Sequence, residues 1–278
     1  MSRVDAHHHL WDVASRDYPW MDGVWADPLR GRFDVPALAK VVAPHDVTAT
    51  VVVQAVSDLD ETRELLALGS PLVAGVVGWV DLTAPDVADV LAGLVAGPGR
   101  LVGVRHQVQD EPDPRWLLRD DVVRGLRAVA AAGLAYDLLV KPPQMPAAIE
   151  VVRALPEVRF VLDHLGKPDI VGGGQQPWAD GITALAAGGN VAAKLSGLVT
   201  EADWAAWTPA QLTPYARHAL VAFGPDRLMF GSDWPVCTLA ASYEQVVAFA
   251  ESVLAEAGLD PAGRDAVFGG TACHVYRL

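Results

Sequence analysis

Short apolar segments alternate with helical segments along the whole chain, and this alternation limits the fold more than any other feature. Several apolar segments are apolar on both faces, as in parallel strands covered by helices. Alternation repeated eight times predicts an α/β fold, a single (β/α)8 TIM barrel. The expected strands are 3–9, 48–56, 72–82, 101–108, 134–140, 158–165, 190–198 and 227–235.

The segments between the strands carry local helix signals. Pro85-Asp86 opens one helix and Gly97 closes it, and Gly133 is expected to end the helix that follows Asp120-Asp121. Segment 10–33 has no clean period and many turn residues, so we expect a long loop over the barrel mouth. No repeat or linker divides the 278 residues, and we expect one barrel domain over residues 1–278.

Composition excludes several classes of partner. The chain has 21 Lys+Arg against 34 Asp+Glu, a net charge of −13, and no basic cluster, so nucleic acid and anionic membranes are poor partners. Its two cysteines make no disulfide framework. We find no apolar run of membrane-span length and no signal peptide. We therefore expect a cytoplasmic protein that acts on a small molecule.

Polar residues gather at the carboxyl ends of the expected strands, where a TIM barrel places its active site. The opposite strand ends carry almost nothing comparable. This asymmetry is the strongest evidence for an active site in the sequence. The residues are His7, His9, Gln54, Trp79, Asp81, Arg105, His106, Lys141, Asp163, His164, Lys194, Ser196 and Asp233.

Side chains alternate between the two faces of a strand, which predicts their direction. His7 and His9 therefore point one way and His8 the other. By the same rule Asp163 and His164 cannot both point into the barrel.

At the end of the fourth strand, Arg105 rather than His106 is the expected inward residue. Lys194 is either a cation of the site or a buried ion-pair partner, and the sequence leaves both interpretations open.

Histidines and a carboxylate at one barrel mouth suit hydrolysis. Neutral imidazoles with a carboxylate bind a divalent metal such as zinc and leave a position for water, whose pKa the metal lowers. A carboxylate at the opposite rim would accept the proton of the water. Without a metal, the histidines and the Arg and Lys cations would stabilise the oxyanion directly.

Five motifs together resemble the amidohydrolase superfamily, and within it the sugar-lactonase branch. They are "VDAHHHLWD" (4–12), "GVRHQVQDEPD" (103–113), "FVLDHLGKP" (160–168), "KLSGL" (194–198) and "MFGSDWPVC" (229–237). This branch includes L-fuconolactonase, L-rhamnonolactonase-like enzymes and 2-pyrone-4,6-dicarboxylate lactonases. The similarity extends over essentially the whole chain.

The resemblance implies a distorted (β/α)8 barrel that opens a sugar lactone to its aldonic acid. Carried over by position, His7 and His9 are the histidine pair of the first strand and His164 is the histidine of the sixth. Asp233 is the aspartate that activates water. Arg105 occupies the position where the pyrone-dicarboxylate enzymes place an arginine, and we include Arg105, His9 and His164 with Asp233 in the catalytic set.

The sequence departs from the binuclear members of the superfamily. It lacks a bridging lysine or glutamate on the fourth strand and a histidine on the fifth, and Arg105 would repel a second cation. We expect at most one metal ion, zinc before others, and no organic cofactor. The expected ligands are His7, His9, His164 and Asp233. Related lactonases of this branch work without a required metal.

Aromatic residues near the mouth suit a sugar ring. Trp20 and Trp25 in the long loop, Trp234 after the eighth strand, and the polar His106 and Lys141 are the expected substrate contacts. Cations at the mouth would also suit a pyrone dicarboxylate, so that lactone is an alternative substrate. A decarboxylase of the same superfamily and a non-catalytic sugar-binding barrel are further alternatives.

Overall fold

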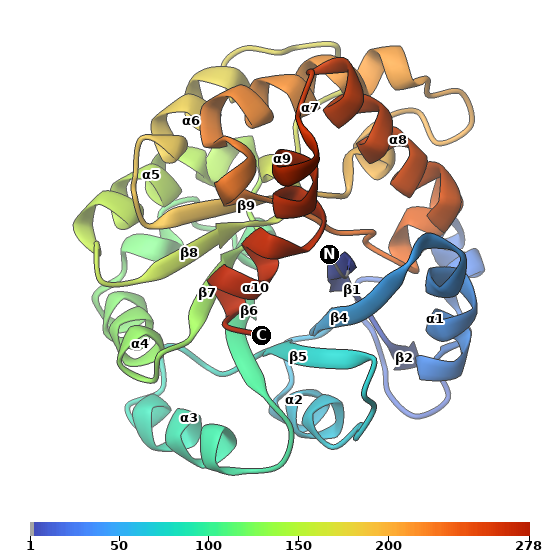
Figure 1. The fold of residues 1–278 in the computed structure, drawn as a ribbon. Helices are drawn as coiled ribbons and strands as arrows, with labels where there is room; N and C mark the ends of the chain where they lie inside the picture. Colours follow the sequence, from blue (N-terminus) through green and yellow to red (C-terminus); the bar gives the residue numbers. More distant parts are fainter. Residues whose placement is uncertain (1–2) are drawn as a thin grey trace.

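Eight parallel strands form a nearly closed barrel in the computed structural model, which describes residues 3–278 (Figure 1). All eight expected strands are present, in the order β1-β4-β5-β6-β7-β8-β9-β10, so the predicted TIM barrel is confirmed. Their bounds are β1 Arg3–His8, β4 Val47–Val53, β5 Val73–Gly78, β6 Leu101–His106, β7 Ala135–Leu138, β8 Arg159–Leu162, β9 Val191–Leu195 and β10 Leu228–Phe230.

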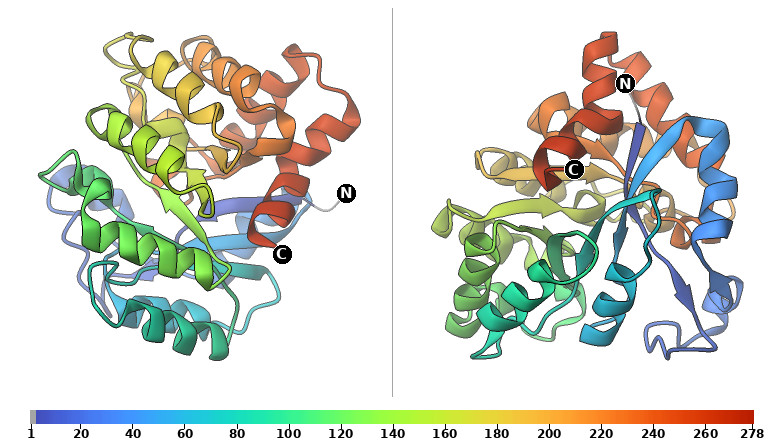
Figure 2. Two further views of the ribbon diagram at one scale, coloured as in Figure 1. Left: turned by 90° about the vertical axis from the view of Figure 1, so that its left-hand side faces the viewer. Right: turned by 60° about the horizontal axis from the view of Figure 1, so that its bottom comes forward.

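A helix follows each strand and lies outside the barrel (Figure 2). The predicted helix signals are in place: Asp86 precedes α3, and Gly97 ends it. The helices are α1 Val35–Val42, α2 Leu59–Leu66, α3 Val87–Ala96, α4 Asp120–Ala131, α5 Met145–Ala154, α6 Trp178–Ala186, α7 Pro209–Phe223 and α8 Tyr243–Glu256, followed by α9 Pro261–Asp265 and α10 Thr271–Tyr276. Among residues 3–278, no helix is both long and apolar enough to span a membrane.

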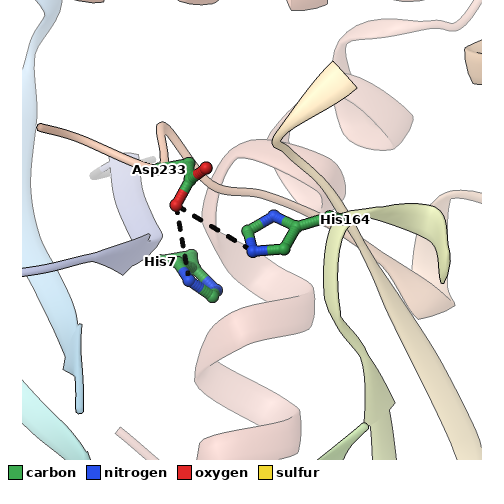
Figure 3. Close-up of side chains that lie close together, drawn as sticks. All are labelled: His7, His164 and Asp233. Atoms are coloured by element: carbon green, nitrogen blue, oxygen red, sulfur yellow. Dashed lines mark ion pairs between the residues drawn. The ribbon is translucent and has the colours of Figure 1, made fainter. Parts of the chain in front are cut away.

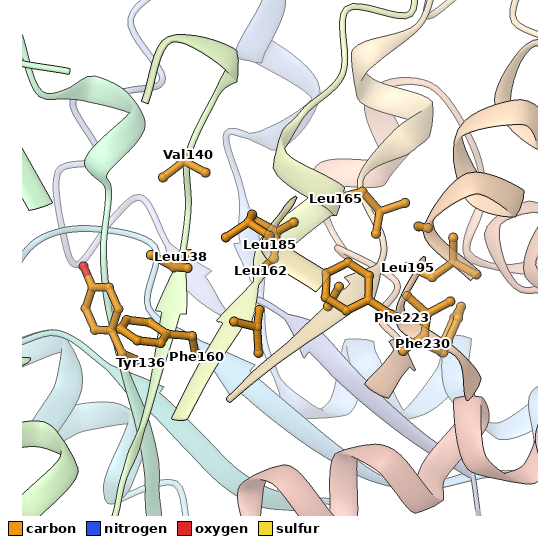
Figure 4. Close-up of a cluster of buried hydrophobic side chains, with 14 of the residues drawn as sticks. Tyr136, Leu138, Val140, Phe160, Leu162, Leu165, Leu185, Leu195, Phe223 and Phe230 are labelled. Atoms are coloured by element: carbon orange, nitrogen blue, oxygen red, sulfur yellow. The ribbon is translucent and has the colours of Figure 1, made fainter. Parts of the chain in front are cut away.

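Alternate residues of the strands pack into two separate cores. Outward-facing residues such as Leu138, Phe160 and Phe230 form the large core between barrel and helices (Figure 4). Inward-facing residues such as Val51 and Val53 form a smaller core inside the barrel. Helix α10 lies across the centre of the barrel and adds residues to this inner core, so the C-terminal helix plugs one end (Figure 1). The opposite end of the barrel, at the carboxyl ends of the strands, is not covered by α10 and can hold an active site.

The seam between β1 and β10 is closed by the residues that follow each strand. The His9 N–H donates to the Trp234 carbonyl at 2.7 Å, and the Asp233 N–H donates to the His7 carbonyl at 2.8 Å. The barrel therefore closes through the segments that carry the predicted active-site residues.

The expected loop over the mouth contains a small antiparallel pair, β2 (Trp11–Asp12) with β3 (Arg32–Phe33). Its apolar side chains form a third cluster that includes Trp11, Tyr18 and Leu29. This cluster packs against Ala55, which follows β4, and so fixes the loop beside the carboxyl end of the barrel.

Candidate active site

An extra residue in β1 directs two histidines into the barrel. Asp5 pairs with Thr50 and His8 pairs with Val52. Between these two pairs, β1 contains one residue more than β4. Such a bulge resets the alternation of side chains. Ala6 belongs to the inner core and His7 faces the same side, whereas His8 lies outside and contacts Thr50 Oγ1 at 2.9 Å. The predicted directions of the three histidines are confirmed.

Close approach of β10 to β1 requires a glycine before the aspartate. A Cβ at Gly231 would lie 2.7 Å from the Cβ of His7, which real side chains do not tolerate. Two residues later, Asp233 adopts a left-handed backbone with φ of 57°. Strain of this kind in a non-glycine residue is typical of functional sites. The turn aims the Asp233 carboxylate at the histidines.

Asp163 and His164 both point into the barrel, so the expectation that only one does is wrong. Strand β8 ends at Leu162, and His164 then takes a left-handed backbone with φ of 52°, where strand alternation no longer applies. His164 Nδ1 contacts Ser196 Oγ at 2.9 Å. A Cβ at Gly197 would lie 2.5 Å from that imidazole, so a glycine is needed to admit it.

Three imidazole Nε2 atoms surround one oxygen of Asp233. Oδ1 lies 3.7 Å from His7, 3.5 Å from His9 and 3.9 Å from His164. Figure 3 shows two of these contacts. The donor atoms of His7, His164 and Asp233 all lie within 4.8 Å of one another, close enough to share one metal ion. His9 lies outside this compact set but contacts Asp233 as closely.

The protonation states of His7, His164 and Asp233 are those needed to bind a metal ion or a water molecule between them. Burial lowers the pKa of His7 well below its usual value and that of His164 to about 4, so both imidazoles are neutral at pH 7. Burial alone would raise the pKa of Asp233, but the neighbouring imidazoles outweigh it and the pKa falls. His7 and His164 are therefore neutral beside an ionised carboxylate.

Two buried carboxylates and two buried cations lie beneath the histidines. Arg105 faces inward as predicted, and its Nη1 donates to Asp163 Oδ2 at 3.0 Å. Lys194 is an ion-pair partner: its Nζ lies 2.9 Å from Asp163 and 2.6 Å from Asp137. Tyr276 of α10 donates to Asp137 at 2.7 Å. Sequence reasoning missed Asp137 and Tyr276.

A pocket of about 360 Å³ opens above the histidines at the carboxyl end of the barrel. Trp20, Trp25 and Lys141 line it as predicted, and so do His9, His164, Arg105 and Asp233. Trp204, which the sequence reading did not select, adds a third indole, 6.1 Å from Trp25 between ring centroids. The pocket thus joins an aromatic wall to the histidine cluster.

Two expected substrate contacts lie elsewhere. His106 points away from the pocket, stacks on Trp116 at 4.3 Å and contacts Glu111 at 2.7 Å. Trp234 is buried and packs against Phe33. Neither side chain lines the pocket. Each directly follows a site residue, Arg105 or Asp233, and at these two places the next side chain faces away from the pocket, unlike His164 after Asp163.

The wall of the pocket at Ala55 depends on a buried carboxylate in α2. Glu61 Oε2 accepts from the backbone N–H groups of Ala55 and Val56 at 2.9 and 3.1 Å. Burial raises the pKa of this carboxyl to about 7. No sequence pattern singled out Glu61.

The whole chain is similar to proteins of known family. The amidohydrolase family matches residues 4–278. An L-fucono-1,5-lactonase of Burkholderia ambifaria is 39% identical and one of Burkholderia multivorans 40% identical, each over 99% of this chain and 96% of the relative. An amidohydrolase of Burkholderia multivorans with bound zinc has a TM-score of 0.94 at 39% identity, with all of both chains covered.

Proposed function

The chain belongs to the amidohydrolase family, and we propose that it hydrolyses a sugar lactone of the L-fucono-1,5-lactone kind to the aldonic acid. The observation that carries this proposal is the ionised Asp233 carboxylate held among three histidines at the base of a tryptophan-lined pocket. Relatives at 39–40% identity over nearly the whole chain are L-fucono-1,5-lactonases.

The donor set fits one divalent ion. Three Nε2 atoms face one carboxylate oxygen, and burial keeps His7 and His164 neutral. His7, His164 and Asp233 would hold the ion, with His9 as a further ligand, and zinc suits nitrogen and oxygen donors of this type. A bound ion would polarise the lactone carbonyl and lower the pKa of a bound water. The bound zinc of the Burkholderia multivorans amidohydrolase supports this choice.

The residues of the chain divide the reaction between them. Asp233 accepts a proton from water as the water oxygen attacks the lactone carbonyl carbon. The imidazoles and Arg105 surround the oxyanion that forms. As the bond from the carbonyl carbon to the ring oxygen breaks, Asp233 returns its proton to that oxygen, which becomes the hydroxyl of the aldonic acid. Asp233 thus ends the cycle ionised, as it began.

The balance of charge in the pocket favours a neutral substrate. The cations on its wall are Arg105, Lys141 and Lys167, and its carboxylates are Asp110, Glu201 and Asp233. Arg105 is already paired with Asp163, and Lys167 contacts Glu201 at 3.1 Å. A dianionic pyrone dicarboxylate would leave charges unpaired here, whereas a neutral sugar lactone stacks on the indoles.

A substrate panel tests the proposal. Purified protein is assayed for acid release from L-fucono-, L-rhamnono- and galactonolactones and from 2-pyrone-4,6-dicarboxylate, with metal analysis of the same preparation. We expect turnover of L-fuconolactone and little of the pyrone diacid. Folded protein that turns over no lactone would refute the proposal, and carbon dioxide release from aromatic acids would replace it with a decarboxylase.

A further inference from the structure

Lys194 lies directly beneath His7, on the side away from the pocket. Its Nζ is 3.1 Å from His7 Nδ1, 2.6 Å from Asp137 Oδ2 and 2.9 Å from Asp163 Oδ1. The side chains of Lys194, Asp137 and Asp163 are completely buried. Two carboxylates face the ammonium group, which has three N–H donors and no acceptor.

The contact with Lys194 determines what His7 Nδ1 does. Because an ammonium only donates, a hydrogen bond between them requires a lone pair on Nδ1, which leaves the imidazole proton on Nε2. Asp163 Oδ1 lies 3.2 Å from the same nitrogen and would accept from it if the proton were on Nδ1. Lys194 Nζ is slightly nearer, at 3.1 Å, and Asp163 Oδ1 already faces that ammonium at 2.9 Å, so we take Lys194 as the partner of His7 Nδ1.

The other side of His7 gives the same result. His9 Nδ1 lies 2.8 Å from the carbonyl oxygen of Val53, which only accepts, so Nδ1 of His9 carries a proton. The Nε2 lone pair of His9 then faces His7 Nε2 at 3.2 Å. Only a proton on His7 Nε2 makes this contact a hydrogen bond. Two partners with fixed roles thus select one tautomer.

One contact competes with this arrangement. Arg105 Nη1 lies 3.3 Å from His7 Nε2 and would donate to a lone pair there. This distance is longer than the contacts of His7 with Lys194 and with His9. Arg105 Nη1 also has a nearer acceptor, Asp163 Oδ2 at 3.0 Å. The chain from Lys194 through His7 to His9 satisfies more donors at shorter range.

We propose that Lys194 is a positioning residue that fixes His7 as the Nε2–H tautomer and thereby limits the affinity of the site for a divalent metal. A metal binds the Nε2 lone pair, so coordination by His7 requires its proton to move to Nδ1. There the proton would face the Lys194 ammonium and would have only Asp163 Oδ1 as an acceptor. Lys194 instead keeps the His7 proton on Nε2, where it is donated to Nε2 of His9 at the base of the pocket.

Nitrogen NMR of ¹⁵N-labelled protein treated with chelator tests the tautomer directly, with His7→Asn used to assign the signals. We expect the Nε2–H form for His7 and the Nδ1–H form for His9. A His7 proton on Nδ1 in the unaltered protein would overturn the proposal. Because no substrate is needed, its failure is distinguishable from failure of the proposed lactonase activity.

Variants distinguish an effect of Lys194 on the His7 tautomer from an effect on folding. Lys194→Met alone would leave two buried carboxylates without their cation, so the test combines it with Asp137→Asn, which removes one charge of each sign. Tyr276→Phe is the matched control, since it removes a hydrogen bond to Asp137 but keeps Lys194. The double variant should lose the Nε2–H preference of His7, and the control should keep it. An unchanged tautomer in the double variant would overturn the proposal.

Calorimetric titration with zinc chloride completes the test. We expect the double variant to bind zinc at least about tenfold more tightly than the unaltered protein, the size of effect that residues contacting a ligand histidine have on metal affinity. Tyr276→Phe should bind zinc as the unaltered protein does. Equal or weaker zinc binding by the double variant would contradict a role for Lys194 in limiting coordination.

Discussion

Arg105 and Asp163 form an ion pair inside the barrel, with Nη1 3.0 Å from Oδ2 and at most 3% of either side chain exposed. Neighbouring groups hold Asp163 ionised: burial would raise its pKa, but the Lys194 and Arg105 cations and the contact with His7 together lower it well below its usual value. The pair sits between the inner core and the pocket, so it affects both stability and the position of His7.

Arg105→Met should destabilise the protein strongly, because it leaves Asp163 with one cation fewer in a buried place. Breaking a buried pair costs about 3 kcal/mol or more of the free energy of unfolding. Urea unfolding measures the change. The control is Arg63→Ala in the exposed Arg63–Asp60 pair, for which we expect less than about 1 kcal/mol. Equal effects of the two substitutions would disprove the structural role of Arg105.

Gly231→Ala should impair the site more than the fold. The new methyl group would lie 2.7 Å from His7 Cβ and 3.3 Å from Ser196 Cβ, so His7 must move away from Asp233. A displacement of this kind at a catalytic group costs on the order of 10²-fold in rate. Gly93→Ala in α3 is the control, since nothing lies within 4 Å of its added Cβ. Lactonase assays on both variants measure the loss of activity. Full activity of Gly231→Ala would contradict the close approach described for β1 and β10.

Sequence patterns predicted the barrel well, because each strand and helix has its own local signal. Apolar runs marked all eight strands, and the carboxyl-end rule for barrels placed His7, His9 and Asp233 at one mouth. The error at Asp163 and His164 arose because alternation holds only inside a strand. The left-handed turn at His164 has no residue-level signal in the sequence.

Buried charge partners could not be predicted because they are distant in sequence. Asp137 is a single acidic residue in an apolar strand, and its partners lie 57 residues away at Lys194 and 139 residues away at Tyr276. Only the closed barrel and the α10 plug bring them together. His106 and Trp234 show the converse, since each adjoins a site residue in sequence and faces away from the site in the fold.

Glu61 should make stability depend on pH. Its pKa is about 7 in the folded protein against 4.5 as the reference value, so the folded state binds more protons between these values and stability falls as the pH rises through them. Glu61→Gln lacks this loss and still offers an oxygen to Ala55 and Val56. The free energy of unfolding of the variant minus that of the unaltered protein should rise by about 1–3 kcal/mol from pH 4.5 to pH 8. A constant difference over this range would show that the carboxyl is not perturbed.

Trp204→Ala should weaken substrate binding and leave the chemical step largely intact. The indole lines the pocket beside Trp25 but is not among the contacts of Asp233. Loss of a stacking face removes interactions made equally in the ground and transition states, which raises KM and spares kcat. Trp207→Phe, whose indole donates to the Ala240 carbonyl outside the pocket, is the control. A fall in kcat with unchanged KM would place Trp204 in the chemistry instead.

Asp233→Asn tests the central claim most directly. Asparagine has nearly the same shape and tolerates the left-handed backbone at this position, so the fold and its stability should be retained. It cannot accept a proton from water at neutral pH. With L-fuconolactone as substrate, we predict that kcat falls on the order of 10²–10⁴-fold while circular dichroism and thermal stability stay unchanged. Hydrolysis by Asp233→Asn at the rate of the unaltered protein would contradict the proposed mechanism.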